Sequence, residues 1–200
     1  MKVFFFFLLF TCGINAQQLE SLKILKIKHD SIETQLKLKY QEEIKGKSES
    51  EISEIYYQNL LSRSKNNRER LDHYFSAVQT FLETQKLIGP SQEAAQQEIP
   101  DKTANYSQGF PALYKEVHDF IKNQYQDRLD EFFTKSAKIH FIVQNDHSLY
   151  IEKVEGTEKE FNDLALLAFL MTAGKWESAF QRGINVKSKF VLPVKFVVEE

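Results

Sequence analysis

The chain has 200 residues, with 26 Lys and Arg against 28 Asp and Glu, which gives a formal net charge of −2. This near-balance argues against a nucleic-acid-binding protein, because such proteins normally carry a strong basic excess. A hydrophobic share of 42% is enough for a buried core, and a single cysteine excludes both an intramolecular disulfide and a cysteine-based zinc cluster.

Residues 1–16 have the layout of a secretory signal peptide. Lys2 gives a positive start, Val3–Phe10 is an unbroken apolar run, and Ala16 is a small residue at the cleavage position. The run is far shorter than the ~20 apolar residues that a membrane-spanning helix needs. We therefore predict cleavage after Ala16 and an exported mature chain without a transmembrane helix. The alternative is a lipid on Cys12, which follows a sequence loosely similar to a bacterial lipobox.

A first long helix is predicted from Gln17 to about Lys45. Apolar residues recur there at three-, four- and seven-residue steps, and only His29 interrupts the stripe. Gly46 fits a helix stop.

A second long helix is predicted from about Ser50 to Leu87. Ser48 and Glu51 match a capping box that would open it. The stretch Arg63–Arg70 is polar on all sides, so we expect the helix to fray or kink there. Two long helices with a short connection indicate an antiparallel helical hairpin over residues 17–87, whose apolar stripes pack on each other or on a second copy.

Residues 88–105 are predicted to be a linker, because two prolines and three glutamines interrupt the apolar pattern. Residues 106–200 then alternate helix and strand signals. A helix opens at Phe110-Pro111, where proline is tolerated in the first turn. Alternating apolar residues predict a strand hairpin from Lys138–Gln144 and Leu149–Val154.

A further helix and two strands complete this C-terminal domain. Thr157 and Glu160 match a second capping box, for a helix that stops at Gly174. A short strand is expected at Lys175–Phe180, and the last strand, Val186–Val198, alternates apolar residues with lysines. The predicted fold is therefore α+β: an N-terminal long helical hairpin, then a two-layer domain of order α-β-β-α-β-β with an antiparallel sheet.

Three segments of the C-terminal half form a more specific pattern. They are Gly109–Tyr114 in the opening helix, Lys175-Trp176 with Gly183, and the closing segment Phe190-Val191-Leu192-Pro193-Val194-Lys195-Phe196. Over roughly residues 106–198 the chain thereby resembles the C-terminal domain of the TonB energy-transducer family. A full transducer also has an inner-membrane helix and a long Pro-rich spacer, in place of which this chain has the signal peptide and the hairpin.

The resemblance implies a protein-binding module of the cell envelope, periplasmic or envelope-associated in a Gram-negative bacterium. Its partner would be an envelope protein or an outer-membrane receptor, of which it captures an extended segment by strand addition. The resemblance also implies a link to outer-membrane transport.

The final strand is expected to lie at an edge of the sheet, because Pro193 has no amide to donate and is poorly tolerated in a central strand. An edge leaves backbone groups free, and an extended peptide can add there. The alternative is that the lysines and the proline only protect the edge against aggregation. The candidate partner-binding residues are Val186, Lys187, Lys189, Phe190, Val191, Leu192, Pro193 and Lys195.

Motifs of catalysis are missing from the sequence. The five histidines form no HExxH and no metal-spaced pair, and there is neither a phosphate-binding glycine loop nor a nucleophile elbow. Trp176 is expected to be a core residue. We expect a non-enzymatic protein with no cofactor and no metal. The second function class is a structural or assembly protein that oligomerises through its helical hairpin in coiled-coil fashion.

Overall fold

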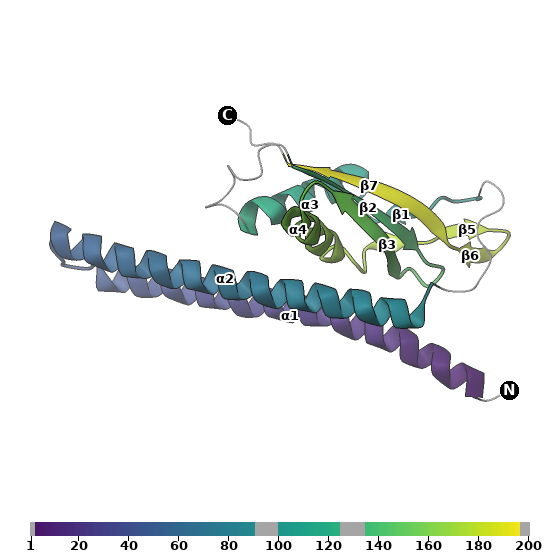
Figure 1. Ribbon diagram of the computed structural model, residues 1–200, viewed down its shortest axis with the longest axis horizontal. Coiled ribbons are helices and arrows are strands. Elements are labelled where there is room, and N and C mark those ends of the chain that lie inside the picture. The colour runs from purple at the N-terminus through teal and green to yellow at the C-terminus, as the bar shows by residue number, and fades with distance from the viewer. Residues whose placement is uncertain (1–2, 91–99, 125–134, 197–200) are drawn as a thin grey trace. The chain divides into compact units, whose positions relative to one another are not determined.

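The computed structural model describes residues 3–90, 100–124 and 135–196, with side chains from residue 20 onward. The chain divides into two compact units, one formed by Glu20–Ala77 and the other by Val78–Glu200 together with Met1–Leu19. The fold is α+β, with an N-terminal helical hairpin followed by antiparallel sheets (Figure 1). None of the described helices is both long enough and apolar enough to span a membrane.

The helical hairpin consists of α1 (Val3–Glu43) and α2 (Glu49–Ile88), which lie side by side (Figure 1). Gly46 lies in the connection with a φ of 70°, a left-handed conformation that glycine adopts without strain. The fraying expected within Arg63–Arg70 does not occur, because α2 is helical throughout. Polar side chains of that stretch find partners on α1, as described below.

Half of the predicted capping box at the start of α2 is present, because the Ser48 hydroxyl bonds to the Glu51 carboxylate and not to a backbone N–H. The carboxylate of Glu51 accepts hydrogen bonds from the backbone N–H of Ser48 at 2.9 Å and from its hydroxyl at 2.7 Å. The helix ladder begins at the same place, where Ile52 N–H donates to the Ser48 carbonyl. These bonds, with Lys47 nearby, lower the pKa of Glu51 to about 2.

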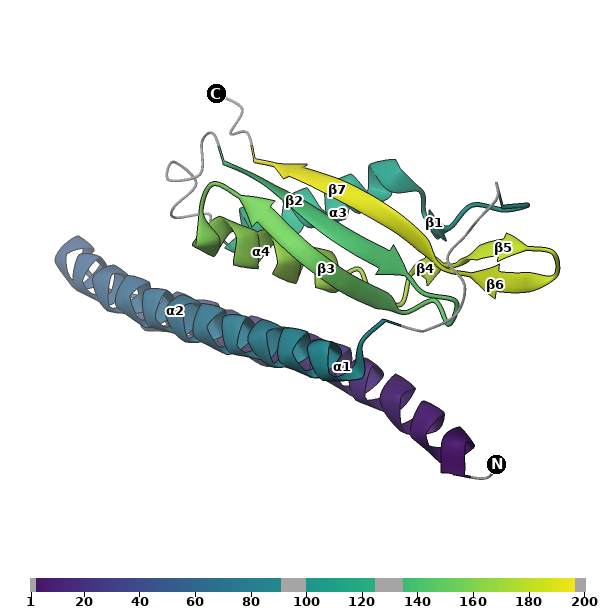
Figure 2. The same cartoon turned by 45° about the vertical axis from the view of Figure 1, so that its right-hand side comes forward.

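The C-terminal unit is built on a three-stranded antiparallel sheet of order β3-β2-β7. Its central strand is β2 (Ser136–Val143), flanked by β3 (Leu149–Gly156) and β7 (Ser188–Lys195). Two helices, α3 (Phe110–Gln124) and α4 (Lys159–Leu170), cover one face of this sheet (Figure 2). Buried apolar residues of the three strands point toward these helices and form part of the core.

The expected short strand at Lys175–Phe180 is two strands in the structure. β4 (Trp176–Glu177) pairs with β1 (Asn105–Tyr106), and β5 (Ala179–Gln181) pairs with the next strand along the chain. Lys102 also bridges to Phe180, so the described end of the predicted linker adds to the C-terminal unit. The middle of that linker, residues 91–99, lies outside the described residues.

The expected final strand is likewise divided. Only its first residue, Val186, lies in β6 (Ile184–Val186), which turns back on β5 through Arg182 and Gly183, and β7 then pairs with β2. Arg182 and Gly183 both have positive φ, which is the backbone of a type I′ hairpin turn. A tight turn fixes β6 beside β5, so the chain must cross to another sheet before it reaches β7.

The second predicted capping box does not form. The residue before α4 is Glu158, which makes no side-chain cap hydrogen bond, so Thr157 is not the N-cap. The Glu158 carboxylate instead forms an ion pair with Lys135 from the start of β2.

Trp176 is the centre of the C-terminal core, with only 3% of its surface exposed. Five aromatic rings lie within 6.2 Å of its own, measured between centroids: Tyr106, Phe110, Phe141, Phe169 and Phe190. These rings come from β1, α3, β2, α4 and β7, so Trp176 joins nearly every layer of the unit.

Replacement of Trp176 by alanine should lower the free energy of unfolding of the C-terminal unit by about 3–5 kcal/mol, because a large cavity opens where several layers meet. Chemical denaturation followed by circular dichroism measures the loss. The matched control is Phe180→Ala, since Phe180 is 40% exposed, and it should cost less than about 1 kcal/mol. Equal losses in the two variants would contradict a core role for Trp176.

The pKa of Glu51 gives a second test, now of the hairpin. Because it is lower in the folded than in the unfolded chain, the contribution of Glu51 to stability is complete above its ordinary pKa of 4.5 and disappears as the pH falls toward about 2. In the Ser48→Ala variant the Glu51 pKa should rise toward its ordinary value, as measured by NMR titration of the carboxyl group. Ser50→Ala is the control and should leave the pKa unchanged; a rise in neither variant would contradict the assignment.

Candidate functional site

The first candidate site is the outer edge of β7. One hydrogen bond shows which of its residues bond to β2 and which face outward. Phe196 N–H donates to the Lys135 carbonyl at 3.2 Å, in register with the pairing of Ser136 with Lys195. In an antiparallel ladder every second residue bonds to the neighbouring strand. The backbone groups of Phe190, Leu192 and Val194 therefore face β2, and those of the residues between them face outward.

The outward-facing residues of β7 are Lys189, Val191, Pro193 and Lys195, and all four side chains are exposed. Three of them carry a backbone N–H, and all four carry a carbonyl. Pro193 sits in this outward phase, so its missing N–H removes no bond from the ladder with β2. No described strand pairs with this edge, which is where the sequence placed the final strand.

The remaining predicted site residues have other positions. Val186 belongs to β6, pairs with Ala179 and is buried, while Lys187 lies between β6 and β7. Phe190 and Leu192 turn their side chains toward the helix side of the sheet and their backbone groups toward β2. The structure thus brings four of the eight predicted residues to one open edge.

The opposite edge of the sheet, on β3, is bonded at Ile151 by a side chain. The bond from Gln144 N–H to the Ser148 carbonyl at 2.8 Å sets the phase of the β2–β3 hairpin and turns the backbone of Ile151 outward. Gln85 of α2 donates to the Ile151 carbonyl at 2.7 Å and accepts from the Ile151 N–H at 2.8 Å. Its amide thus provides the donor and the acceptor that another strand would provide.

The Gln85 contact is part of a buried helix face. Val78, Phe81 and Gln85 follow each other at helical spacing, and each is at most 2% exposed. All three fall within the unit that begins at Val78, so the last turns of α2 belong to the C-terminal unit.

The open edge is bordered by an aromatic row on the helix side. Phe110, Tyr114 and His118 lie four residues apart on α3 and are all partly exposed. Phe110 contacts the ring of Phe190 at 6.1 Å, and His118 stacks on Phe196 at 5.3 Å. α3 therefore runs along β7 and offers ring surface beside its unpaired backbone.

Positive charge lies on the other face of the sheet. Lys189 is paired with Glu152 at 2.6 Å, but Lys138 and Lys195 have no ionic partner among the described residues. Lys153 and His140 both hydrogen-bond Glu155 and lower the pKa of its carboxyl group. The charge left unpaired is thus at the end of β7 near Lys195.

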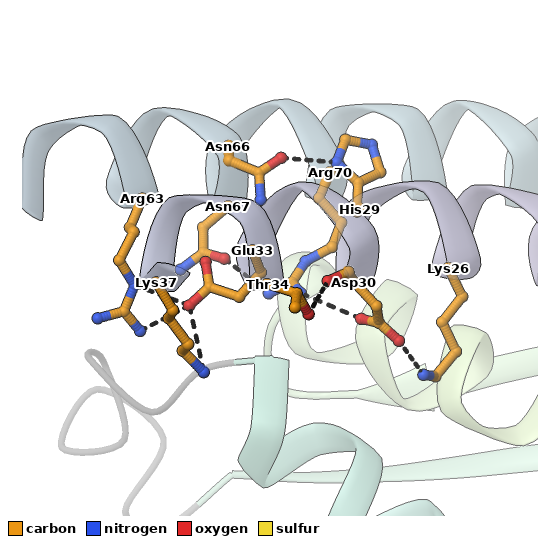
Figure 3. A network of polar contacts seen from close by, with 10 residues as sticks. All are labelled: Lys26, His29, Asp30, Glu33, Thr34, Lys37, Arg63, Asn66, Asn67 and Arg70. Atoms are coloured by element: carbon orange, nitrogen blue, oxygen red, sulfur yellow. Dashed lines mark hydrogen bonds and ion pairs between the residues drawn. The ribbon is translucent and has the colours of Figure 1, made fainter. Parts of the chain in front are cut away.

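A second cluster of polar groups lies between α1 and α2 in the hairpin (Figure 3). Arg63 donates through Nε to Glu33 at 2.7 Å, and Asn59 donates to the Leu36 carbonyl at 2.9 Å. Farther along, the guanidinium of Arg70 lies 4.0 Å from Asp30. The stretch that looked like a break in α2 is therefore its contact surface with α1.

His29 is at the centre of this cluster and is 1% exposed. Its Nδ1 lies 2.9 Å from the side-chain amide oxygen of Asn66. Its Nε2 lies 3.1 Å from Nδ1 of His73. Polar groups that must meet across a helix pair fix the register of the two helices. Among the described side chains, no group of three or more His, Cys, Asp or Glu could hold a metal ion.

Sequence reasoning missed Gln85 and the partners of His29. A glutamine near the end of a helix is ordinary on a solvated face, and its strand partner Ile151 lies 66 residues away. The interruption of the apolar stripe by His29 was a visible signal, as was the polar stretch of α2. Which of these polar residues contact each other depends on the register of α1 against α2.

Replacement of Gln85 by leucine should lower the free energy of unfolding by about 2–4 kcal/mol, because two hydrogen bonds are lost and the backbone of Ile151 stays buried without a partner. Gln79→Leu is the matched control: it is the same substitution at an exposed position of the same helix, and it should change stability by less than about 0.5 kcal/mol. Urea denaturation measures both. A Gln85→Leu variant as stable as the control would contradict a role of Gln85 in closing the β3 edge.

No protein-family model, no curated protein and no solved structure matches this chain. The resemblance to the TonB C-terminal domain therefore remains a sequence-based expectation.

Proposed function

We propose that this protein is a binding module that captures an extended segment of another protein by strand addition to β7. The observation that carries the proposal is the open edge of β7, where the backbone N–H groups of Lys189, Val191 and Lys195 face away from β2. A peptide that adds to such an edge gains main-chain hydrogen bonds without any rearrangement of the sheet.

The contrast between the two edges supports this function. The β3 edge is closed by a buried glutamine, which is one of the ways in which proteins protect a sheet edge. Among the residues that the structure describes, only lysines and Pro193 protect the β7 edge. Protection of that kind prevents aggregation but leaves donors and acceptors in reach of a specific partner.

The surroundings of the β7 edge favour a peptide over a flat protein surface. Side chains on one face of an added strand would lie over Phe110, Tyr114 and His118, and those on the other face would lie near Lys195. The resemblance to the TonB C-terminal domain points to the same mode of binding. With the signal-peptide layout of residues 1–16, it supports an exported protein of the cell envelope whose partner is another envelope protein.

The proposal is tested by Val191→Pro. The substitution removes an outward-facing donor and leaves the ladder with β2 intact, so capture should weaken at least ~10-fold while the domain stays folded. The probe is a peptide of about ten residues, selected from a random displayed library on the purified wild-type protein and measured by fluorescence anisotropy.

Two control variants separate capture from folding. Val191→Thr keeps the donor and the strand shape, so it should bind like the wild type. Leu192→Pro removes a donor that faces β2 and should destabilise the domain by about 3 kcal/mol. Unchanged affinity in a folded Val191→Pro variant, or a selection that returns no peptide, would contradict strand addition at β7.

A further inference from the structure

The face of α1 that points away from α2 carries an exposed, uncharged stripe. Its positions follow each other at alternating steps of three and four residues: Ile24, Ile27, Ser31, Thr34, Leu38 and Gln41. The three apolar members are 58%, 69% and 55% exposed. Leu38 lies nine residues after His29, which is about half a turn around the helix from the contact with α2.

The alternating spacing is that of the core positions of a coiled coil. The residues beside the stripe are mostly charged, and they include both signs: Lys23, Lys28, Asp30, Lys37 and Glu42. A membrane-binding face would instead be bordered mainly by Lys and Arg. The stripe therefore has the pattern of a helix that packs on another helix.

We propose that α1 packs on α1 of a second copy of this chain, antiparallel, along this stripe. In this order Ile27 lies opposite Leu38 of the partner subunit, and Ser31 lies opposite Thr34 of the partner subunit. The small residues are at the centre, where they let the two helices approach closely, and the apolar layers lie on either side. Two-fold symmetry repeats each contact, so the interface closes as a dimer.

Charge decides between the two possible directions. In the antiparallel order Asp30 lies beside Lys37 of the partner subunit, and symmetry makes this pair twice. Both side chains are about half exposed. Asp30 is paired with Lys26 and lies 4.0 Å from Arg70, and Lys37 is paired with Glu33, so each would share its charge with the new partner. In a parallel dimer Lys23 would lie beside Lys28 of the partner subunit, and this repulsion would offset the attraction between Lys37 and Glu42 of the partner subunit. The antiparallel dimer is therefore the favoured one.

The dimer is tested by analytical ultracentrifugation of the purified protein and of Ile27→Glu combined with Leu38→Glu. The wild type should be dimeric at about 100 µM, and the double variant should raise the dimer dissociation constant at least ~10-fold without loss of helicity. The matched control is Leu60→Glu with Leu61→Glu, which places the same charges at exposed apolar positions of α2. A monomeric wild type at this concentration, or equal weakening by both double variants, would overturn the proposal.

Disulfide crosslinking tests the direction. In a Cys12→Ser background, Ser31→Cys and Thr34→Cys chains should crosslink to each other when mixed, and more readily than either crosslinks to itself. Preferential crosslinking of each variant to its own kind would overturn the antiparallel order.

Discussion

The structure depends on one constraint: backbone N–H and C=O groups at the two edges of a small sheet need hydrogen-bond partners. A three-stranded sheet has two outer strands, and a buried N–H or C=O without a partner costs free energy. On β3 that need is met by Gln85, which offers one donor and one acceptor to Ile151. On β7 no described strand meets it. The β3 edge therefore packs within the protein, and the β7 edge is available to a partner.

The Gln85 contact also explains how the chain is divided. The last turns of α2, from Val78 onward, belong to the C-terminal unit. Without them the β3 edge would be bare. The rest of α2 belongs to the hairpin, where His29 and Arg63 take part in polar contacts that set which residues of α1 and α2 meet. Such contacts add specificity more than stability.

The sequence predicted the parts of the fold whose cause is local. The periodicity of α1 and α2, the capping box at Ser48 and the alternation of the final strand all depend on residues a few positions apart. The burial of Trp176 followed from its size. These features do not require knowledge of which segments meet in space.

The features that sequence reasoning missed depend on distant contacts. Val186 is separated from the rest of the expected final strand because the tight turn at Arg182-Gly183 pairs β6 with β5. At α4 the N-cap is Glu158 and not Thr157, and Glu158 pairs with Lys135, 23 residues away in the sequence. At the candidate site, Pro193 indicated an edge strand. Which residues of that strand face outward could be decided only from its register with β2.

The central claim is that β7 presents an open edge whose outward amides are free. Amide hydrogen exchange followed by NMR tests it directly, residue by residue. In the free protein the N–H groups of Leu192 and Val194 should exchange slowly, because they face β2, and those of Val191 and Lys195 should exchange rapidly. The rapid pair should become slow when a captured peptide is bound. Slow exchange of Val191 and Lys195 in the free protein, or no protection of them in the complex, would contradict the account.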